Sequence, residues 1–147
     1  MQVLNEKSAG AIIFRKKDSE IYYLLLHAKY KTDYWEFPKG LIEKNEDLES
    51  TVRREIFEEC GLKDIKFING FKESINYFYR RGDKLIMKEV IYFLVESLEN
   101  NVRISPEHVG YEWVKYEEAI PRLKENLRKV LTKAKDFLVK QRSLIGN

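Results

Sequence analysis

Cysteine is almost absent from this chain, since Cys60 is the only one among its 147 residues. A single thiol excludes a disulfide within the chain and a zinc site built on cysteines. Long apolar runs are missing too: no stretch approaches the roughly 18 to 20 residues that a membrane-spanning helix needs. The first ten residues lack the charged-then-apolar order of a secretory signal. We therefore expect a cytoplasmic protein that enters no membrane, with Cys60 as a small buried side chain.

Internal repeats, low-complexity stretches and Gly/Ser-rich linkers are also lacking, so we expect one domain over residues 1–147. Neither sign of charge is in large excess. The chain has 27 Lys and Arg against 24 Asp and Glu, which leaves a formal net charge of +3. This average indicates no particular class of partner, so local clusters of charge are more informative.

What the chain does contain is a series of apolar, β-rich runs separated by turns. The expected strands are residues 8–15, 21–27, 65–68, 71–79, 85–95, 102–104 and 111–114. Two amphipathic helices complete the pattern, one over residues 48–60 and one in the tail from residue 116, where apolar residues recur every three or four positions. This order predicts an α+β fold in which a mixed sheet carries one early and one late helix.

The early helix has recognisable ends. Asn45 suits either the N-cap or a tight turn before the helix, and Asp47 lies near the positive end of the helix dipole. Gly61 directly follows the last helical residue, where a left-handed conformation is expected to stop the helix.

Three carboxylates share one side of this helix. At about 100° per residue, Glu59 lies about 40° from Glu55, and Glu58 lies about 60° away in the other direction. The direction of Glu59 falls within the apolar stripe of the helix. A carboxylate that faces the protein body is costly unless something neutralises it.

Three sources of neutralisation are open. Arg54 precedes Glu58 by four residues and can pair with it, but one guanidinium does not serve three acids. One or two of the carboxyl groups can take up a proton. Divalent cations are the third source, and a helix that offers oxygen ligands without His or Cys favours Mg²⁺ or Mn²⁺ over zinc. A solvated charged face with local ion pairs is the structural alternative.

The spacing of these residues resembles the complete Nudix box. The matching positions are Gly40, five residues, Glu46, seven residues, Arg54-Glu55-Ile56, one residue, Glu58-Glu59, one residue, and Gly61-Leu62. The resemblance implies a Nudix fold, in which a mixed β-sheet is sandwiched between helices. It also implies hydrolysis of a nucleoside diphosphate linked to another moiety.

The box also implies roles for its residues. Glu55, Glu58 and Glu59 are expected to bind Mg²⁺, with Mn²⁺ as a substitute and the carbonyl oxygen of Gly40 as a further ligand. Glu46, Arg54 and Gly61 form the structural part of the motif: the first two pair to brace the loop and helix, and the glycine ends the helix.

Beyond the box, the chain is similar to the asymmetrical diadenosine tetraphosphate hydrolases over nearly its full length. The matching pieces are SAGAIIF from residue 8, WEFPKG from residue 35, KEVIYFL from residue 88 and SPEHVGYEWV from residue 105. The resemblance implies cleavage to ATP and AMP. It places Lys39 and Lys88 on the phosphates and stacks Tyr77 or Tyr79 on an adenine.

The catalytic residues that this resemblance implies are Glu55, Glu59 and Glu107, the last completing the set of metal ligands or bases. His108 suits a loop hydrogen bond better than catalysis. Two departures concern the loops: Lys44-Asn45 stands where the family commonly has a pair such as Pro-Gly, and Asp33-Tyr34 replaces a His-rich pair.

Other functions of the same fold stay open. The basic loop with Lys29, Lys31 and Lys39 suits a nucleoside triphosphate, an RNA 5′ end or an inositol pyrophosphate as well. A non-catalytic nucleotide-binding sensor is the alternative outside enzymes. We expect a small nucleoside polyphosphate as the partner, RNA only under the alternative, no DNA, and a monomer or homodimer.

Overall fold

The computed structural model describes residues 2–30 and 33–144. Its strands are β1 (Val3–Lys17), β2 (Glu20–Ala28), β3 (Trp35–Glu36), β4 (Lys39–Leu41), β5 (Ile65–Arg81), β6 (Lys84–Ser97) and β7 (His108–Val114). Its helices are α1 (Leu48–Cys60), α2 (Tyr116–Ala119), the 3₁₀ turn η1 (Ile120–Arg122) and α3 (Glu125–Leu144).

The strands form one mixed sheet of order β3-β2-β1-β6-β5, with β4 paired to β1 and β7 paired to β2. The parallel pairing of β1 with β6 lies at its centre and runs from Val3–Leu85 to Phe14–Glu96. The pairing of β5 with β6, and of β2 with its neighbours, is antiparallel. This confirms the expected mixed sheet.

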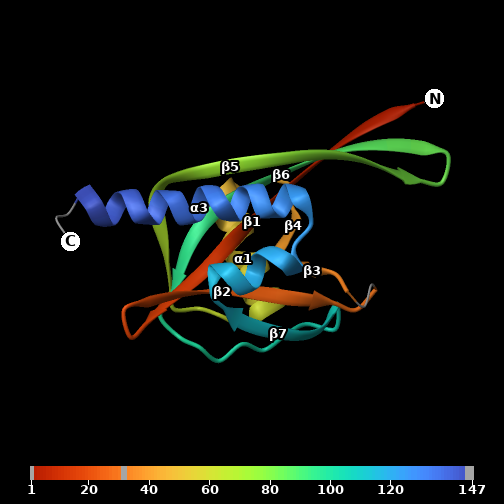
Figure 1. Ribbon diagram of the computed structural model, residues 1–147. Coiled ribbons are helices and arrows are strands. Elements are labelled where there is room, and N and C mark those ends of the chain that lie inside the picture. The colour runs from red at the N-terminus through yellow and green to blue at the C-terminus, as the bar shows by residue number, and fades with distance from the viewer. Residues whose placement is uncertain (1, 31–32, 145–147) are drawn as a thin grey trace.

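Helices cover both faces of the sheet, as Figure 1 shows with α3 in front of it and α1 behind it. Successive residues of a strand point to opposite faces. In β1, Ile12 and Phe14 accordingly join the core beneath α3, whereas Ala11 and Ile13 join the core beneath α1. Because both faces are covered, residues 8–14 are buried without alternation. The sandwich of a sheet between helices is confirmed.

The predicted ends of the early helix are confirmed, and the role of Asn45 is settled. The side chain of Asp47 caps α1 by accepting a hydrogen bond from the Ser50 N–H at 2.7 Å. Asn45 instead has a φ of 68°, the left-handed conformation of a tight turn. Gly61 adopts a φ of 70° and ends the helix. Cys60 is buried in the core beneath α1, as expected.

Some expected elements differ. Residues 102–104 form no regular strand; the Arg103 N–H instead donates to the carbonyl oxygen of Cys60 at 2.8 Å. The two strands expected over 65–79 are one strand, β5, whose pairing is irregular between Phe67 and Lys72. The tail is divided by η1, which contains Pro121, into α2 and α3.

The expected loop before the Nudix-like box is more regular than predicted. It contains β3 and β4, which pair with β2 and β1. Residues 31 and 32, including the Lys31 of the expected basic loop, lie outside the described residues. Within the described part of the chain, no helix is both long and apolar enough to cross a membrane.

We predict that Leu131→Ala destabilises the fold strongly. Leu131 is fully buried on the core-facing side of α3, and such a truncation leaves a cavity that costs about 2–5 kcal/mol in the free energy of unfolding. Urea titration followed by circular dichroism measures this loss. Val139→Ala, at an exposed position of the same helix, is the matched control and should change stability by less than about 0.5 kcal/mol. Equal losses would contradict the assignment of the buried face of α3.

Candidate functional site

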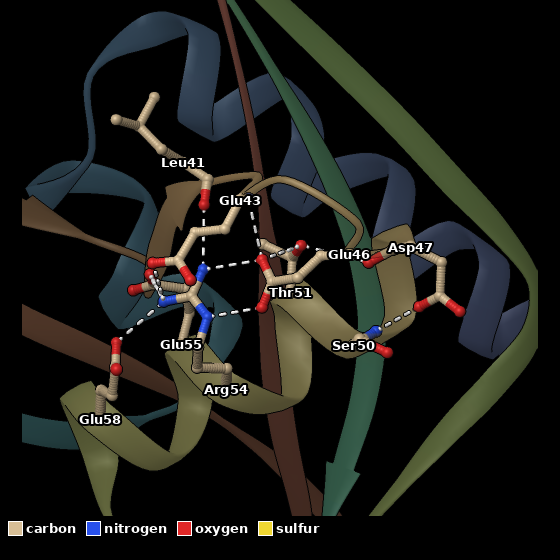
Figure 2. A network of polar contacts seen from close by, with 9 residues as sticks. All are labelled: Leu41, Glu43, Glu46, Asp47, Ser50, Thr51, Arg54, Glu55 and Glu58. Carbon is tan, nitrogen blue, oxygen red and sulfur yellow. Dashed lines mark hydrogen bonds and ion pairs between the residues drawn. The ribbon is translucent and has the colours of Figure 1, made fainter.

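Arg54 fastens the loop before α1 to the helix, as Figure 2 shows. Its Nε donates to Glu46 Oε2 at 2.7 Å and its Nη2 to Glu46 Oε1 at 3.0 Å, which is a two-pronged contact between guanidinium and carboxylate. Nη2 also donates to the carbonyl oxygen of Leu41 at 2.9 Å. On the other side, Nη1 lies 2.7 Å from Glu55 Oε1 and 3.0 Å from Glu58 Oε1. The pairing expected between Glu46 and Arg54 is therefore present.

Glu46 is held by more than Arg54. Its Oε1 also accepts hydrogen bonds from the Glu43 N–H at 2.9 Å and from the Thr51 hydroxyl at 2.9 Å. These donors, Arg54 first among them, lower the pKa of Glu46 to about 2. The loop-helix junction is consequently built around a carboxylate that stays charged at neutral pH.

Glu59 is the carboxyl group that Arg54 does not reach. Glu59 and Glu55 are only 5% and 9% exposed. Burial, and after it the neighbouring Glu55 carboxyl group, raises the pKa of Glu59 well above its usual value. Arg54 thus gives hydrogen bonds to Glu55 and Glu58, whereas Glu59 is left to a proton or to an external cation.

Gly40 lies directly against this acidic pair. A Cβ at position 40 would stand 2.0 Å from the carboxyl carbon of Glu55, far inside any real contact. β4 is fixed to β1 by the pairing of Gly40 with Ala9, so the backbone has little freedom to withdraw. Only glycine allows the Glu55 carboxyl group and the backbone of β4 to approach this closely.

The donor set fits a hard divalent cation. Glu55 and Glu59 offer adjacent carboxylate oxygens, and the backbone of Gly40 lies against them; such oxygen ligands suit Mg²⁺ and Mn²⁺. As the side chains stand, no group of three or more His, Cys, Asp or Glu in the described residues converges on one metal position. The side chain of Glu58 explains this, because it is exposed and turned towards Arg54.

A hollow of about 340 Å³ brings Glu59 together with Glu107 and Lys39. Its remaining walls are Lys29, Tyr30, Glu36 and His108. Glu107 is exposed in the turn that leads into β7, while Glu59 comes from α1. The fold therefore brings Glu107 into the same hollow as Glu59, the buried acid of α1 that does not pair with Arg54. We call this hollow the acidic hollow.

A larger cleft of about 680 Å³ contains all four residues expected to bind substrate: Lys39, Lys88, Tyr77 and Tyr79. Tyr77 of β5 is the register partner of Lys88 of β6, so these two side chains share a face of the sheet. The rings of Tyr77 and Tyr79 lie 6.3 Å apart. We call this space the tyrosine cleft.

Lys88 has a counter-ion that the sequence did not suggest. Its Nζ lies 3.1 Å from Glu6 Oε1, which also accepts a hydrogen bond from the Tyr79 hydroxyl at 2.8 Å. Hydrogen bonds from Arg81 and then Tyr79 lower the pKa of Glu6 to about 2. Glu6 faces Lys88 because β1 and β6 pair in parallel. This contact joins distant segments of the chain, so no local sequence pattern predicts it.

The two spaces are neighbours, because Tyr30, Glu36 and Lys39 line both. The tyrosine cleft also contains Tyr34, Ile75, Tyr92, Lys124, Asn126 and Leu127. Sequence reasoning missed most of these residues. Tyr34, which lies in the predicted basic loop, could have been identified from the sequence as a candidate to bind a base. Lys124 and Asn126 line the cleft only because α3 begins beside it.

His108 makes the kind of contact that the sequence suggested. Its Nε2 lies 2.8 Å from Glu36 Oε2, and both side chains are buried. Glu36 lies in the short strand β3, between the aromatic residues Trp35 and Phe37. The sequence offered no reason to select it as a functional residue.

Comparisons with known proteins agree with this geometry. The family model for the NUDIX domain matches residues 4–134. The chain is 37% identical over 123 residues to the asymmetrical bis(5′-nucleosyl)-tetraphosphatase of Mus musculus, which covers 77% of this chain and 81% of that protein. It is 27% identical over 143 residues to the RNA pyrophosphohydrolase of Sulfurovum sp. (strain NBC37-1), with 90% and 91% covered.

Among solved structures, a binary complex of the C. elegans Ap4A hydrolase superposes with a TM-score of 0.81 at 30% identity, covering 92% of this chain and 98% of that one. The family match includes β1 from its second residue, the whole of the box and the turn with Glu107 before β7. The spacing of the box, the mixed sheet between helices and the match over most of the sequence lead to one conclusion: this chain belongs to the Nudix family.

Proposed function

We propose that this protein hydrolyses diadenosine tetraphosphate asymmetrically, to ATP and AMP, with Mg²⁺ as cofactor and Mn²⁺ as a substitute. The observation that carries the proposal is the junction of the tyrosine cleft with the acidic hollow through Tyr30, Glu36 and Lys39. One space offers aromatic rings and a lysine for a nucleoside with its phosphates, and the next offers carboxylates for a cation. The mouse relative, named an asymmetrical bis(5′-nucleosyl)-tetraphosphatase, and the C. elegans relative, named an Ap4A hydrolase, support the assignment.

Glu55 and Glu59, joined by Glu58 and the carbonyl oxygen of Gly40, would hold the cation. A divalent ion there supplies polarisation of the phosphate oxygens and a lowered pKa of bound water. Glu55 or Glu107 accepts the proton of the water that attacks phosphorus.

Lys39 and Lys88 oppose the negative charge that develops on the phosphate oxygens. Tyr77 or Tyr79 stacks on an adenine, because a phenol ring offers a flat apolar face to a base. The remaining expectations belong to the same proposal: a single domain over residues 1–147, a cytoplasmic location, and a monomer or homodimer.

A product assay tests the function directly. The protein is incubated with Mg²⁺ and, separately, diadenosine tetraphosphate, nucleoside triphosphates, an RNA with a 5′ triphosphate and an inositol pyrophosphate, and products are separated by chromatography. We expect diadenosine tetraphosphate to be turned over fastest and to give equal amounts of ATP and AMP. Two ADP molecules as products, or faster turnover of the RNA, would overturn the substrate assignment. No turnover of any compound would favour the sensor.

We predict that Glu59→Gln lowers kcat by orders of magnitude, because it removes a charged ligand of the cation on which the reaction depends. The fold should persist, because a neutral amide replaces a buried carboxyl group whose pKa is already raised. Thermal unfolding in Mg²⁺-free buffer checks this. Glu49→Gln is the matched control on the same helix, since Glu49 is exposed and pairs with Arg53. Turnover by Glu59→Gln near that of the control would refute the metal assignment.

Gly40→Ala should displace the Glu55 carboxyl group, because the added Cβ overlaps it. Misplacing a catalytic group by about 1 Å costs on the order of 10²-fold in rate, and we expect a loss of that size in kcat together with weaker Mg²⁺ binding by calorimetry. Gly110→Ala is the control, since the nearest atom to a Cβ there is the Cβ of His27 at 4.0 Å. Unchanged Mg²⁺ affinity in Gly40→Ala would show that this close approach does not shape the cation site.

A further inference from the structure

Glu36 and His108 form a buried pair in the wall of the acidic hollow, and Glu36 also lines the tyrosine cleft. Glu36 Oε2 and His108 Nε2 are 2.8 Å apart, and the side chains are 11% and 2% exposed. Leu26 and His27 of β2 pair with β3 on one edge and with β7 on the other. The contact therefore joins two strands that do not pair with each other, across the strand that lies between them.

His108 anchors the turn that carries Glu107. The His108 N–H donates to the carbonyl oxygen of Ser105 at 3.1 Å, and the Lys29 N–H donates to the carbonyl oxygen of Glu107 at 3.1 Å. The Glu107 N–H is 3.3 Å from Ser105 Oγ. In the part of the chain that the structure describes, no hydrogen bond or ion pair holds the Glu107 carboxylate itself. The position of that carboxylate thus follows from the backbone turn, and the turn is fixed to the sheet through the His108 side chain.

The Glu36–His108 pair is a buried polar contact in the wall of the acidic hollow. Apolar side chains of similar volume commonly replace a buried ion pair without loss of stability. A polar pair at this position is thus better explained by what it positions than by the stability that it adds.

We propose that Glu36 and His108 are positioning residues: their contact fixes the turn 105–107 so that Glu107 faces Glu59 across the acidic hollow. The inference rests on the proposed function only in giving Glu107 a part in catalysis. Glu36 also accepts a hydrogen bond from the Tyr30 hydroxyl at 3.3 Å. This second contact ties the orientation of the turn to a residue that lines the tyrosine cleft as well.

Single substitutions separate positioning from binding. His108→Phe keeps the ring and removes both nitrogens, so kcat for diadenosine tetraphosphate should fall about 10- to 100-fold, as expected for a catalytic group displaced by a fraction of an ångström to 1 Å, while KM changes less than about threefold. Glu36→Leu should behave in the same way. Glu36→Gln keeps an oxygen that accepts from Nε2–H and should restore most of kcat. A loss confined to KM, or no rescue by Gln, would overturn the proposal.

A double-mutant cycle with Glu107 gives the sharpest test. If His108 acts through Glu107, His108→Phe should cost little further kcat once Glu107→Gln is present, because the group it positions is already gone. Losses that multiply in the double variant would show that His108 acts elsewhere. Normal turnover by Glu107→Gln alone would also overturn the proposal, because the turn would then carry no catalytic group.

Glu99→Ala is the control that separates a general loss of stability from a loss of positioning. The Glu99 carboxylate accepts hydrogen bonds at 2.7 Å from the backbone N–H groups of Lys63 and Asp64 and lines neither space of the site. This variant should unfold at a lower temperature than the wild type while keeping its kcat at 25 °C. A matching loss of kcat in Glu99→Ala would attribute the effect of His108→Phe to general destabilisation.

Amide hydrogen exchange tests the pair without any turnover. The Lys29 N–H reports on the turn because it donates to Glu107. Its exchange should be faster in His108→Phe than in the wild type, and unchanged in Glu36→Gln. Unchanged exchange in His108→Phe would overturn the positioning role. If the wild type fails to cleave diadenosine tetraphosphate, the proposed function falls, but the exchange comparison still decides whether this pair holds the turn.

Discussion

The guanidinium group of Arg54 is the contact on which the site depends. With two N–H groups on Glu46 and one on the carbonyl oxygen of Leu41, it fixes the loop that precedes α1. The same group lies against Glu55 and Glu58 and donates a hydrogen bond to each. It reaches no further along the helix, so Glu59 remains a buried acid beside another acid. Because Arg54 does not extend to Glu59, negative charge is left unbalanced where Glu55 and Glu59 meet, and a cation would be favourable there.

The sheet determines which residues lie opposite Glu55 and Glu59. β4 presents Gly40 to Glu55, and the turn before β7 presents Glu107 to Glu59. On the other side of Lys39, β5 and β6 present Tyr77 and Lys88 as register partners. The acidic surface thus comes from α1 and the turn before β7, the aromatic surface comes largely from β5, and the residues that line both spaces join the two. A substrate with a flat base and a row of phosphates matches both surfaces at once.

Several of the charged side chains in the wall of the site are buried and therefore need a partner. Lys88 is only 8% exposed, yet it lies beside Glu6, whose pKa is lowered by Arg81 and Tyr79. Glu36 is buried with His108. In each case a charge within the wall of the site has a partner from a different strand, because an unpaired charge in such a place would be costly. Glu59 is the exception, because burial and the neighbouring Glu55 raise its pKa.

The amino-acid sequence by itself determined the local part of this protein. The helix bounds, the shared side of Glu55, Glu58 and Glu59, and the left-handed stop at Gly61 depend on residues close in the chain, so periodicity and end signals were sufficient to predict them. The complete box spacing added the family and the mixed sheet between helices. The expected strand at 102–104 failed because short β-like runs carry no information on whether a partner strand is available.

Only the tertiary structure decided which distant residues meet. The contact of Glu6 with Lys88 follows from a parallel register, and the contact of Glu36 with His108 follows from two strands on opposite edges of β2. The overlap that reserves position 40 for glycine likewise appears only when β4 is placed against α1. These contacts depend on strand order and register, which arise from the packing of the whole sheet, whereas the pattern along the chain records only which side of each element is apolar.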